Sequence, residues 1–221
     1  MPKLKGLFDS FYNLNEISVD SLIPWLKNPH NTVQLEDYLA NKILYPTTVP
    51  VTEFGMKIDL AILREALRMN SPKSDDMGGS LLRNNPFLNI TLRKIIIPER
   101  FLGYVPDLTS VAWAFVDGLL LNRRKGNWFE DIWTVVLVGN IDEIVGTVLL
   151  PQFGDTTDNL ILTLPGKDYK IKAGSLALVP CPASKYQIAY KFTSGKILGK
   201  NLNVLEVYGG KLGLMIDGRT Q

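Results

Sequence analysis

The sequence predicts an α/β protein that carries an all-β part at its C-terminal end. Three observations lead to this prediction. The first 70 residues contain apolar residues at helical spacing, residues 92–150 alternate between buried strands and a helix, and residues 151–221 contain short strands separated by turn residues. We therefore expect a helical and α/β domain over residues 1–150 and a C-terminal β-domain over residues 151–221.

The N-terminal segment is expected to be helical. It starts with a short apolar turn over residues 22–26. Thr32 is a suitable N-cap for the next helix. That helix has to end near Tyr45, because Pro46 disfavours helical geometry in the residue before it.

An extended connector over residues 46–52 is expected to lead into a further amphipathic helix. Its apolar positions run from Ile58 to Met69 with the i, i+3, i+4 pattern, and Pro72 stops it. Residues 71–85 are rich in Ser, Asp, Gly and Asn, which predicts a linker or mobile loop.

The middle of the chain predicts a strand, a helix and a second strand. Residues 95–97 form a short apolar run suited to a buried strand, and residues 133–139 form another. Between them, Asp107 can cap a helix over residues 108–121. This order suggests one right-handed crossover unit. We expect a short helix over residues 142–150.

After Pro151 the pattern changes to strands separated by Gly, Pro, Asp and Lys turns. We expect these strands to form a compact antiparallel β-barrel or sandwich. The expected strands cover residues 160–164, 175–179, 187–192, 202–208 and 212–216.

Composition excludes several classes of function. The net charge of +2 gives no basic field for nucleic acid, and no apolar run is long enough to span a bilayer. Cys181 is the only cysteine, which fits a reducing compartment, and no signal peptide is visible, so a cytoplasmic location is expected. His30 is the only histidine, so multi-ligand Cys/His zinc sites are excluded by count, and we expect no metal and no cofactor.

Several other residues are expected to have structural rather than binding roles. Asp155 and Asp158 lack the spacing of a calcium loop, so a polar hairpin turn is favoured. Lys211 is expected to face solvent. The glycines of residues 209–219 are expected to serve bulges and tight packing rather than phosphate binding.

Three blocks of sequence, taken in order, resemble the C-terminal half of the glutamate mutase L family, often called MutL. The resemblance runs from about Val19 to Arg219. The blocks are LEDYLANKILYPTTVP (35–50) with LREALR (63–68), VPDL (105–108) with VDGL (116–119), and AGSLALVP (173–180) with GGKLGLMIDGR (209–219).

The resemblance implies a partial actin-like, sugar-kinase-type ATPase fold followed by a C-terminal β-domain. The family accompanies an adenosylcobalamin-dependent mutase and is supposed to act as a reactivating or chaperone-like factor. Its phosphate-binding hairpin belongs to an N-terminal half that we expect this chain to lack. Where the family has a glycine pair after a buried strand, this sequence has Pro98, Glu99 and Arg100. Side chains there would obstruct a nucleotide, and Glu99 would repel phosphates, so we expect a degenerate nucleotide position.

These observations favour a non-catalytic structural or assembly subunit, a pseudo-ATPase scaffold that is not an enzyme. The alternative is one half of a split ATPase or reactivase that needs a separate N-terminal partner chain. A third hypothesis is an unrelated module, such as a coat component. We expect a homo- or hetero-oligomer with other protein subunits. The expected interface residues are Trp113, Phe115, Trp128, Phe129 and Trp133.

Overall fold

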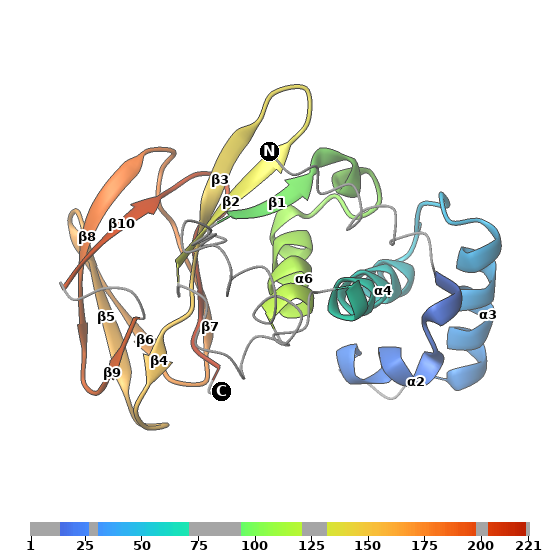
Figure 1. Cartoon of the computed structure of the whole chain (residues 1–221), viewed down its shortest axis with the longest axis horizontal. Helices are drawn as coiled ribbons and strands as arrows, with labels where there is room; N and C mark the ends of the chain where they lie inside the picture. Colours follow the sequence, from blue (N-terminus) through green and yellow to red (C-terminus); the bar gives the residue numbers. More distant parts are fainter. Residues whose placement is uncertain (1–13, 27–30, 71–93, 121–131, 198–202, 220–221) are drawn as a thin grey trace, which may run out of the picture. The chain divides into compact units, whose positions relative to one another are not determined.

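A computed structural model describes residues 14–26, 31–70, 94–120, 132–197 and 203–219 of the chain (Figure 1). The chain divides into two compact units. The helical unit comprises residues 1–88 and 99–126, and the sheet unit comprises residues 89–98 and 127–221. The expected features at His30, in residues 71–85 and at Trp128 and Phe129 lie outside the described residues.

The helical unit consists of helices and short 3₁₀ turns, as the sequence predicts for its N-terminal part. Among its described residues, no helix has both the length and the apolar character needed to cross a membrane. Its elements are η2 (Leu14–Glu16), α2 (Val19–Leu22), η3 (Ile23–Trp25), α3 (Thr32–Leu44), α4 (Glu53–Asn70), η4 (Glu99–Gly103) and α6 (Leu108–Leu120).

Local signals set the ends of these helices. The N-cap of α3 is Asn31, whose side-chain oxygen accepts a hydrogen bond from the backbone N–H of Val33 at 3.0 Å, so the expectation of Thr32 as the cap was wrong by one residue. Helix α3 ends at Leu44, as the proline at position 46 predicts. Asp107 caps α6, because its carboxylate accepts from two backbone N–H groups at the start of the helix.

Helices α4 and α6 pack closely against each other. A Cβ added at Gly118 of α6 would lie 2.6 Å from the Cβ of Leu67 in α4, so glycine permits this approach. The Nε of Arg64 donates to Asp117 across the same interface at 2.7 Å. An apolar cluster joins η2, α2, α3 and α4. Its buried residues include Leu14, Leu22, Leu35, Leu39, Ile58 and Ile62.

The described residues of the sheet unit form three sheets. The five-stranded sheet has the order β1-β2-β3-β11-β7, the four-stranded sheet has the order β10-β8-β5-β6, and β4 pairs with β9. The strands are β1 (Lys94–Pro98), β2 (Ile132–Val138), β3 (Glu143–Leu149), β4 (Gln152–Phe153), β5 (Asn159–Leu164), β6 (Lys167–Lys172), β7 (Leu176–Val179), β8 (Lys185–Phe192), β9 (Gly195–Lys196), β10 (Val204–Tyr208) and β11 (Gly213–Asp217).

The five-stranded sheet is mixed. Strands β1 and β2 are parallel, as expected for strands that flank a helix in the chain, and β3 is parallel to β11, whereas β2–β3 and β7–β11 are antiparallel. The domain boundary expected at residue 150 falls inside the sheet unit, because β1, β2 and β3 share this sheet with β7 and β11.

The short helix expected over residues 142–150 was wrong, since this segment is strand β3. From Val145 to Leu149 every residue is buried, including the polar Thr147, so the segment lacks the alternation of buried and exposed residues that identifies a strand. A short buried run of this kind does not distinguish a central strand from a buried helix.

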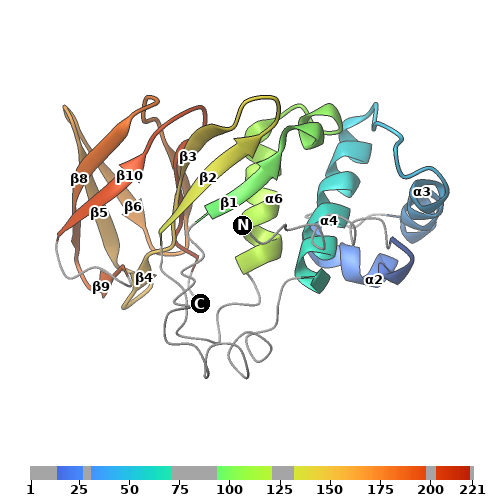
Figure 2. The same cartoon turned by 45° about the horizontal axis from the view of Figure 1, so that its top comes forward.

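Of the two arrangements expected for the C-terminal strands, an antiparallel barrel or a sandwich, the barrel was wrong, because no sheet among the described residues closes into one. Figure 2 shows the strands of the four-stranded sheet and the strands β3, β7 and β11 of the sheet unit. Apolar side chains of the four-stranded sheet share one core with residues of β3, β7 and β11. The hydroxyl of Thr147 in β3 joins these strands by donating to the carbonyl of Tyr208 and accepting from its N–H, both at 2.9 Å.

Candidate functional site

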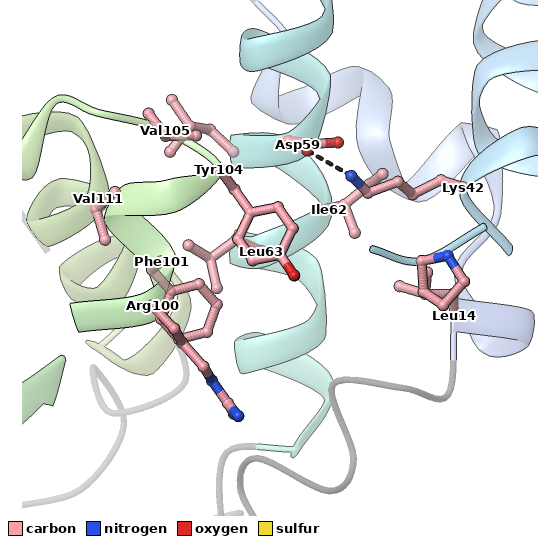
Figure 3. A pocket seen from close by; sticks show the side chains of 12 residues that line it. Leu14, Lys42, Asp59, Ile62, Leu63, Arg100, Phe101, Tyr104, Val105 and Val111 are labelled. Atoms are coloured by element: carbon pink, nitrogen blue, oxygen red, sulfur yellow. Dashed lines mark hydrogen bonds and ion pairs between the residues drawn. The ribbon is translucent and has the colours of Figure 1, made fainter. Parts of the chain in front are cut away.

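The helical unit contains a pocket of about 70 Å³ beside a buried ion pair (Figure 3). Helices α3 and α4 contribute the paired charges Lys42 and Asp59, η4 contributes Arg100, and η2, α4, η4 and α6 contribute apolar walls. The lining residues are Leu14, Lys42, Pro46, Asp59, Leu60, Ile62, Leu63, Arg100, Phe101, Tyr104, Val105 and Val111.

Lys42 forms the centre of the polar end of the pocket. Its ammonium donates to Asp59 Oδ2 at 2.7 Å and to the backbone carbonyl of Thr48 at 2.6 Å. It also lies 5.5 Å from the centroid of the Tyr104 ring. Lys42 and Asp59 are each only 8% exposed, so this ion pair is buried. The second oxygen of Asp59 accepts from the Tyr38 hydroxyl at 3.0 Å.

Burial dominates the electrostatics of this cluster. Desolvation raises the pKa of Asp59, and the ammonium of Lys42 opposes that rise. Burial, together with the negative charge of Asp59, raises the pKa of Tyr38 well above its ordinary value. Tyr38 is therefore a hydrogen-bond donor at neutral pH, and Lys42 and Asp59 neutralise one another.

The size of the pocket limits what it can hold. Pockets for drug-sized ligands have volumes of roughly 300–1,000 Å³, and this pocket measures about 70 Å³. It has room for a few water molecules or a small apolar group. At the polar end of this pocket, Lys42 and Asp59 bind each other at 2.7 Å.

The connector between α3 and α4 depends on this cluster. The carbonyl of Thr48, in the middle of the connector, accepts from the buried ammonium of Lys42, and its N–H donates to the carbonyl of Tyr45 at 3.1 Å. Pro46 and Pro50 restrict the backbone on either side. The ion pair therefore holds the connector in place on the helical unit.

The expected degenerate nucleotide position lies at the end of β1. Pro98 closes the strand, and Glu99 and Arg100 are exposed residues at the start of η4. Arg100 lines the pocket, but in Figure 3 its guanidinium points away from Asp59. Among the described residues, no group of acidic, His or Cys side chains is arranged to hold a metal ion.

The described residues among the expected interface aromatics are mostly buried. Phe115 packs edge-to-face on Phe101 with ring centroids 5.5 Å apart, and Trp133 in β2 is also buried. Trp113 is half-buried on α6. Of these three rings, Trp113 is therefore the one with exposed surface.

Two other buried carboxylates in the described part of the chain, Glu65 and Asp217, have partners of opposite charge. Glu65 accepts from Arg68 at 2.5 and 2.8 Å and from the indole N–H of Trp25 at 3.2 Å. Asp217 accepts from the guanidinium of Arg219 at 2.7 and 2.8 Å. These hydrogen bonds offset the cost of burying the two carboxylates and so stabilise the fold.

The glycines near the C-terminus pack tightly, as the sequence predicts. A Cβ at Gly209 would lie 2.0 Å from the carbonyl oxygen of Pro182. Gly213 has a φ of +63°, and a Cβ there would lie 2.4 Å from the carbonyl oxygen of Val179. Backbone atoms of the protein itself therefore fill the space beside these glycines.

The polar residues assigned to a turn and to the surface lie in a turn and at the surface. Asp155 and Asp158 form a turn in which the carboxylate of Asp158 accepts from the N–H of Asp155 at 2.6 Å. The expected hairpin was wrong, because the flanking strands β4 and β5 lie in different sheets. Lys211 is exposed and pairs with Glu143 at 2.6 Å.

Sequence reasoning missed the Lys42–Asp59 pair. The available signal was a charged residue on the apolar face of each of two consecutive helices, since Lys42 follows Leu35 and Leu39 at helical spacing and Asp59 lies between Ile58 and Ile62. Charges at such positions are buried only when they are paired.

Comparison with known proteins identifies no relative: no family model, no curated protein and no solved structure matches the chain.

Proposed function

We propose that this protein is a non-catalytic assembly subunit, which contributes binding surfaces to a larger protein complex and carries out no nucleotide chemistry. The observation that carries the proposal is a group of exposed apolar side chains at the α3–α4 connector. This connector surface consists of Leu44, Tyr45, Val49 and Val51. Val51 is 93% exposed, and Leu44 is 70% exposed.

Exposed apolar side chains that gather on one segment are typical of protein interaction sites. The connector is also held before any partner binds, because two prolines restrict it and Lys42 binds the carbonyl of Thr48. A segment that is already ordered loses less conformational entropy on binding. The buried ion pair thus supports the proposed role as a positioning element rather than as catalytic machinery.

The pairing of the buried charges supports the non-catalytic part of the proposal. Lys42 with Asp59, Arg64 with Asp117 and Glu65 with Arg68 are all partnered within the helical unit. The proposal agrees with the family resemblance, because Glu99 and Arg100 stand where the family has a glycine pair that lets the backbone approach a nucleotide.

The experiment is size-exclusion chromatography with mass measurement on native extract, for the wild type and two variants. We expect the wild type to elute in a complex well above the 24.7 kDa of one chain. Val49→Ser combined with Val51→Ser should release the monomer, whereas the matched control Val204→Ser, at an exposed valine of the sheet unit, should keep the complex. A wild-type monomer, or a complex that survives the double change, would contradict the proposal.

Nucleotide binding is tested separately by calorimetric titration of the purified chain with Mg-ATP. We expect no binding at micromolar concentrations and no ATP hydrolysis. The split-ATPase alternative predicts instead that co-expression with an N-terminal partner chain restores nucleotide affinity. It has less support, because the exposed side chains of Glu99 and Arg100 begin η4 directly after β1.

A further inference from the structure

The outer face of the four-stranded sheet carries a group of lysines around one apolar residue. In β6, Lys170 and Lys172 are exposed and flank the buried Ile171, so both point away from the core. In β5, Ile161 lies directly opposite Lys170 on one side and directly opposite Lys191 of β8 on the other. Lys170, Ile161 and Lys191 therefore form one row across three strands.

The dimensions of this group follow from sheet geometry. Strands lie about 4.8 Å apart, which places the Cα atoms of Lys170 and Lys191 about 10 Å apart. Residues two apart along a strand are separated by about 7 Å, which is the spacing of Lys170 and Lys172. We call Lys170, Lys172, Lys191 and Ile161 the lysine face.

The charge of the lysine face is not balanced by the residues around it. None of its three lysines forms an ion pair with another described residue, whereas Lys185 on the same sheet pairs with Glu206 at 2.9 Å. The acidic residue beside these lysines is Asp168, two residues before Lys170 in β6, while Glu206 of β10, on the same outer face, is paired with Lys185. Three positive charges and one negative charge leave the lysine face with a net positive charge.

We propose that the lysine face binds an acidic segment of a partner protein, with carboxylates of that segment paired to Lys170, Lys172 and Lys191 around Ile161. Carboxylates on every second residue of an extended segment are spaced about 7 Å apart, which matches Lys170 and Lys172. A partly buried apolar residue within a charged rim is the usual anatomy of a protein interface.

The composition of the lysine face favours an acidic protein segment as its ligand over a nucleic acid or an anionic membrane surface. A single-stranded nucleic acid site combines its basic groove with aromatic side chains on which bases stack, and the residue between Lys170 and Lys191 is the aliphatic Ile161. Stable membrane-surface binding combines basic side chains with apolar side chains that enter the lipid. Ile161 is only half-buried between the two lysines and does not protrude in that way.

The inference rests on the proposed function only in taking the partner to be a protein. Its test measures binding of a fluorescent heptapeptide with alternating glutamate and threonine to the full chain, by anisotropy at low salt. A glutamine–threonine peptide is the neutral control. We expect the acidic peptide to bind, the neutral peptide not to bind, and added salt to weaken the complex.

Variants localise the binding. Replacing Lys170, Lys172 and Lys191 together by glutamine should weaken binding at least about 3-fold, given the usual strength of exposed ion pairs. The control removes the same charge at other exposed lysines, Lys57, Lys94 and Lys196, and should bind as the wild type does. Lys170→Glu with Lys191→Glu should transfer binding to a lysine–threonine peptide.

Equal losses in both triple variants would overturn the inference, as would tighter binding to an oligothymidine strand or to phosphatidylserine vesicles than to the acidic peptide. If the peptide fails to bind while the native complex persists, the inference falls and the assembly function stands. If the peptide binds and the native chain is a monomer, the assembly function falls instead.

Discussion

Replacing Lys42 by methionine is expected to destabilise the helical unit by about 3–5 kcal/mol, the usual cost of removing one partner of a buried ion pair. The change leaves Asp59 buried with only the Tyr38 hydroxyl as a side-chain donor. It also leaves the carbonyl of Thr48 without its donor. The measurement is urea unfolding followed by circular dichroism at 222 nm, which reports the helices.

The loss of stability caused by Lys42→Met should be larger at neutral pH than at acidic pH. Because burial raises the pKa of Asp59, the folded protein holds that proton more tightly than the unfolded chain does. Asp59 therefore stabilises the fold below the unfolded pKa of about 3.9, and this contribution is lost as pH rises through the folded pKa. Without Lys42 the folded pKa rises further, so the variant should lose more stability at pH 7.5 than at pH 4.

Two further variants separate the contribution of the Lys42–Asp59 ion pair from other effects of the substitutions. Combining Lys42→Met with Asp59→Asn should cost less than the two single changes added together, with a coupling of at least about 1 kcal/mol. Lys57→Met, which breaks the exposed Glu53–Lys57 pair, should leave the unfolding midpoint close to that of the wild type. Additive costs for Lys42 and Asp59, or a Lys42→Met cost that is the same at both pH values, would refute the reasoning.

Three further predictions concern the fold. Gly213→Ala places a side chain at a left-handed φ and in a clash with backbone atoms, so it should lower the free energy of unfolding by well over about 1–2 kcal/mol. The control Gly166→Ala, where φ is +84° and the space is open, should lower it by only roughly 1–2 kcal/mol. Similar unfolding midpoints for the two variants would contradict this. Asp107→Ala removes the cap of α6 and should cost about 1 kcal/mol in urea unfolding, whereas Asp107→Asn should nearly preserve stability. Burial raises the pKa of the Cys181 thiol, so the native protein should react with a thiol reagent at pH 8 at least about 10-fold more slowly than the unfolded chain.

The helices could be predicted from the sequence because their signals are local. The proline at position 46 ends α3, Asp107 caps α6, and the apolar period of α4 lies within one continuous segment. The shift of the α3 cap from Thr32 to Asn31 is the kind of error expected when adjacent residues can both act as caps. The strands β5 and β8 were likewise recognisable from their alternation and turn residues.

Strand β3 shows where local reasoning fails. It lies between β2 and β11, and its buried run contains no alternation that identifies a strand. Its parallel partner β11 is about 70 residues away in the chain, so no local pattern could reveal the pairing. The exposed strand β6 was missed for a different reason, since four of its six residues are charged.

The sequence by itself determined the helical beginning, the strand-rich end and the packing role of the C-terminal glycines, because each depends on neighbouring residues. Only the tertiary structure decided which distant residues meet. Lys42 and Asp59 become an ion pair because α3 and α4 pack together. Lys170 and Lys191 become neighbours of Ile161 because strand register places all three on one outer face.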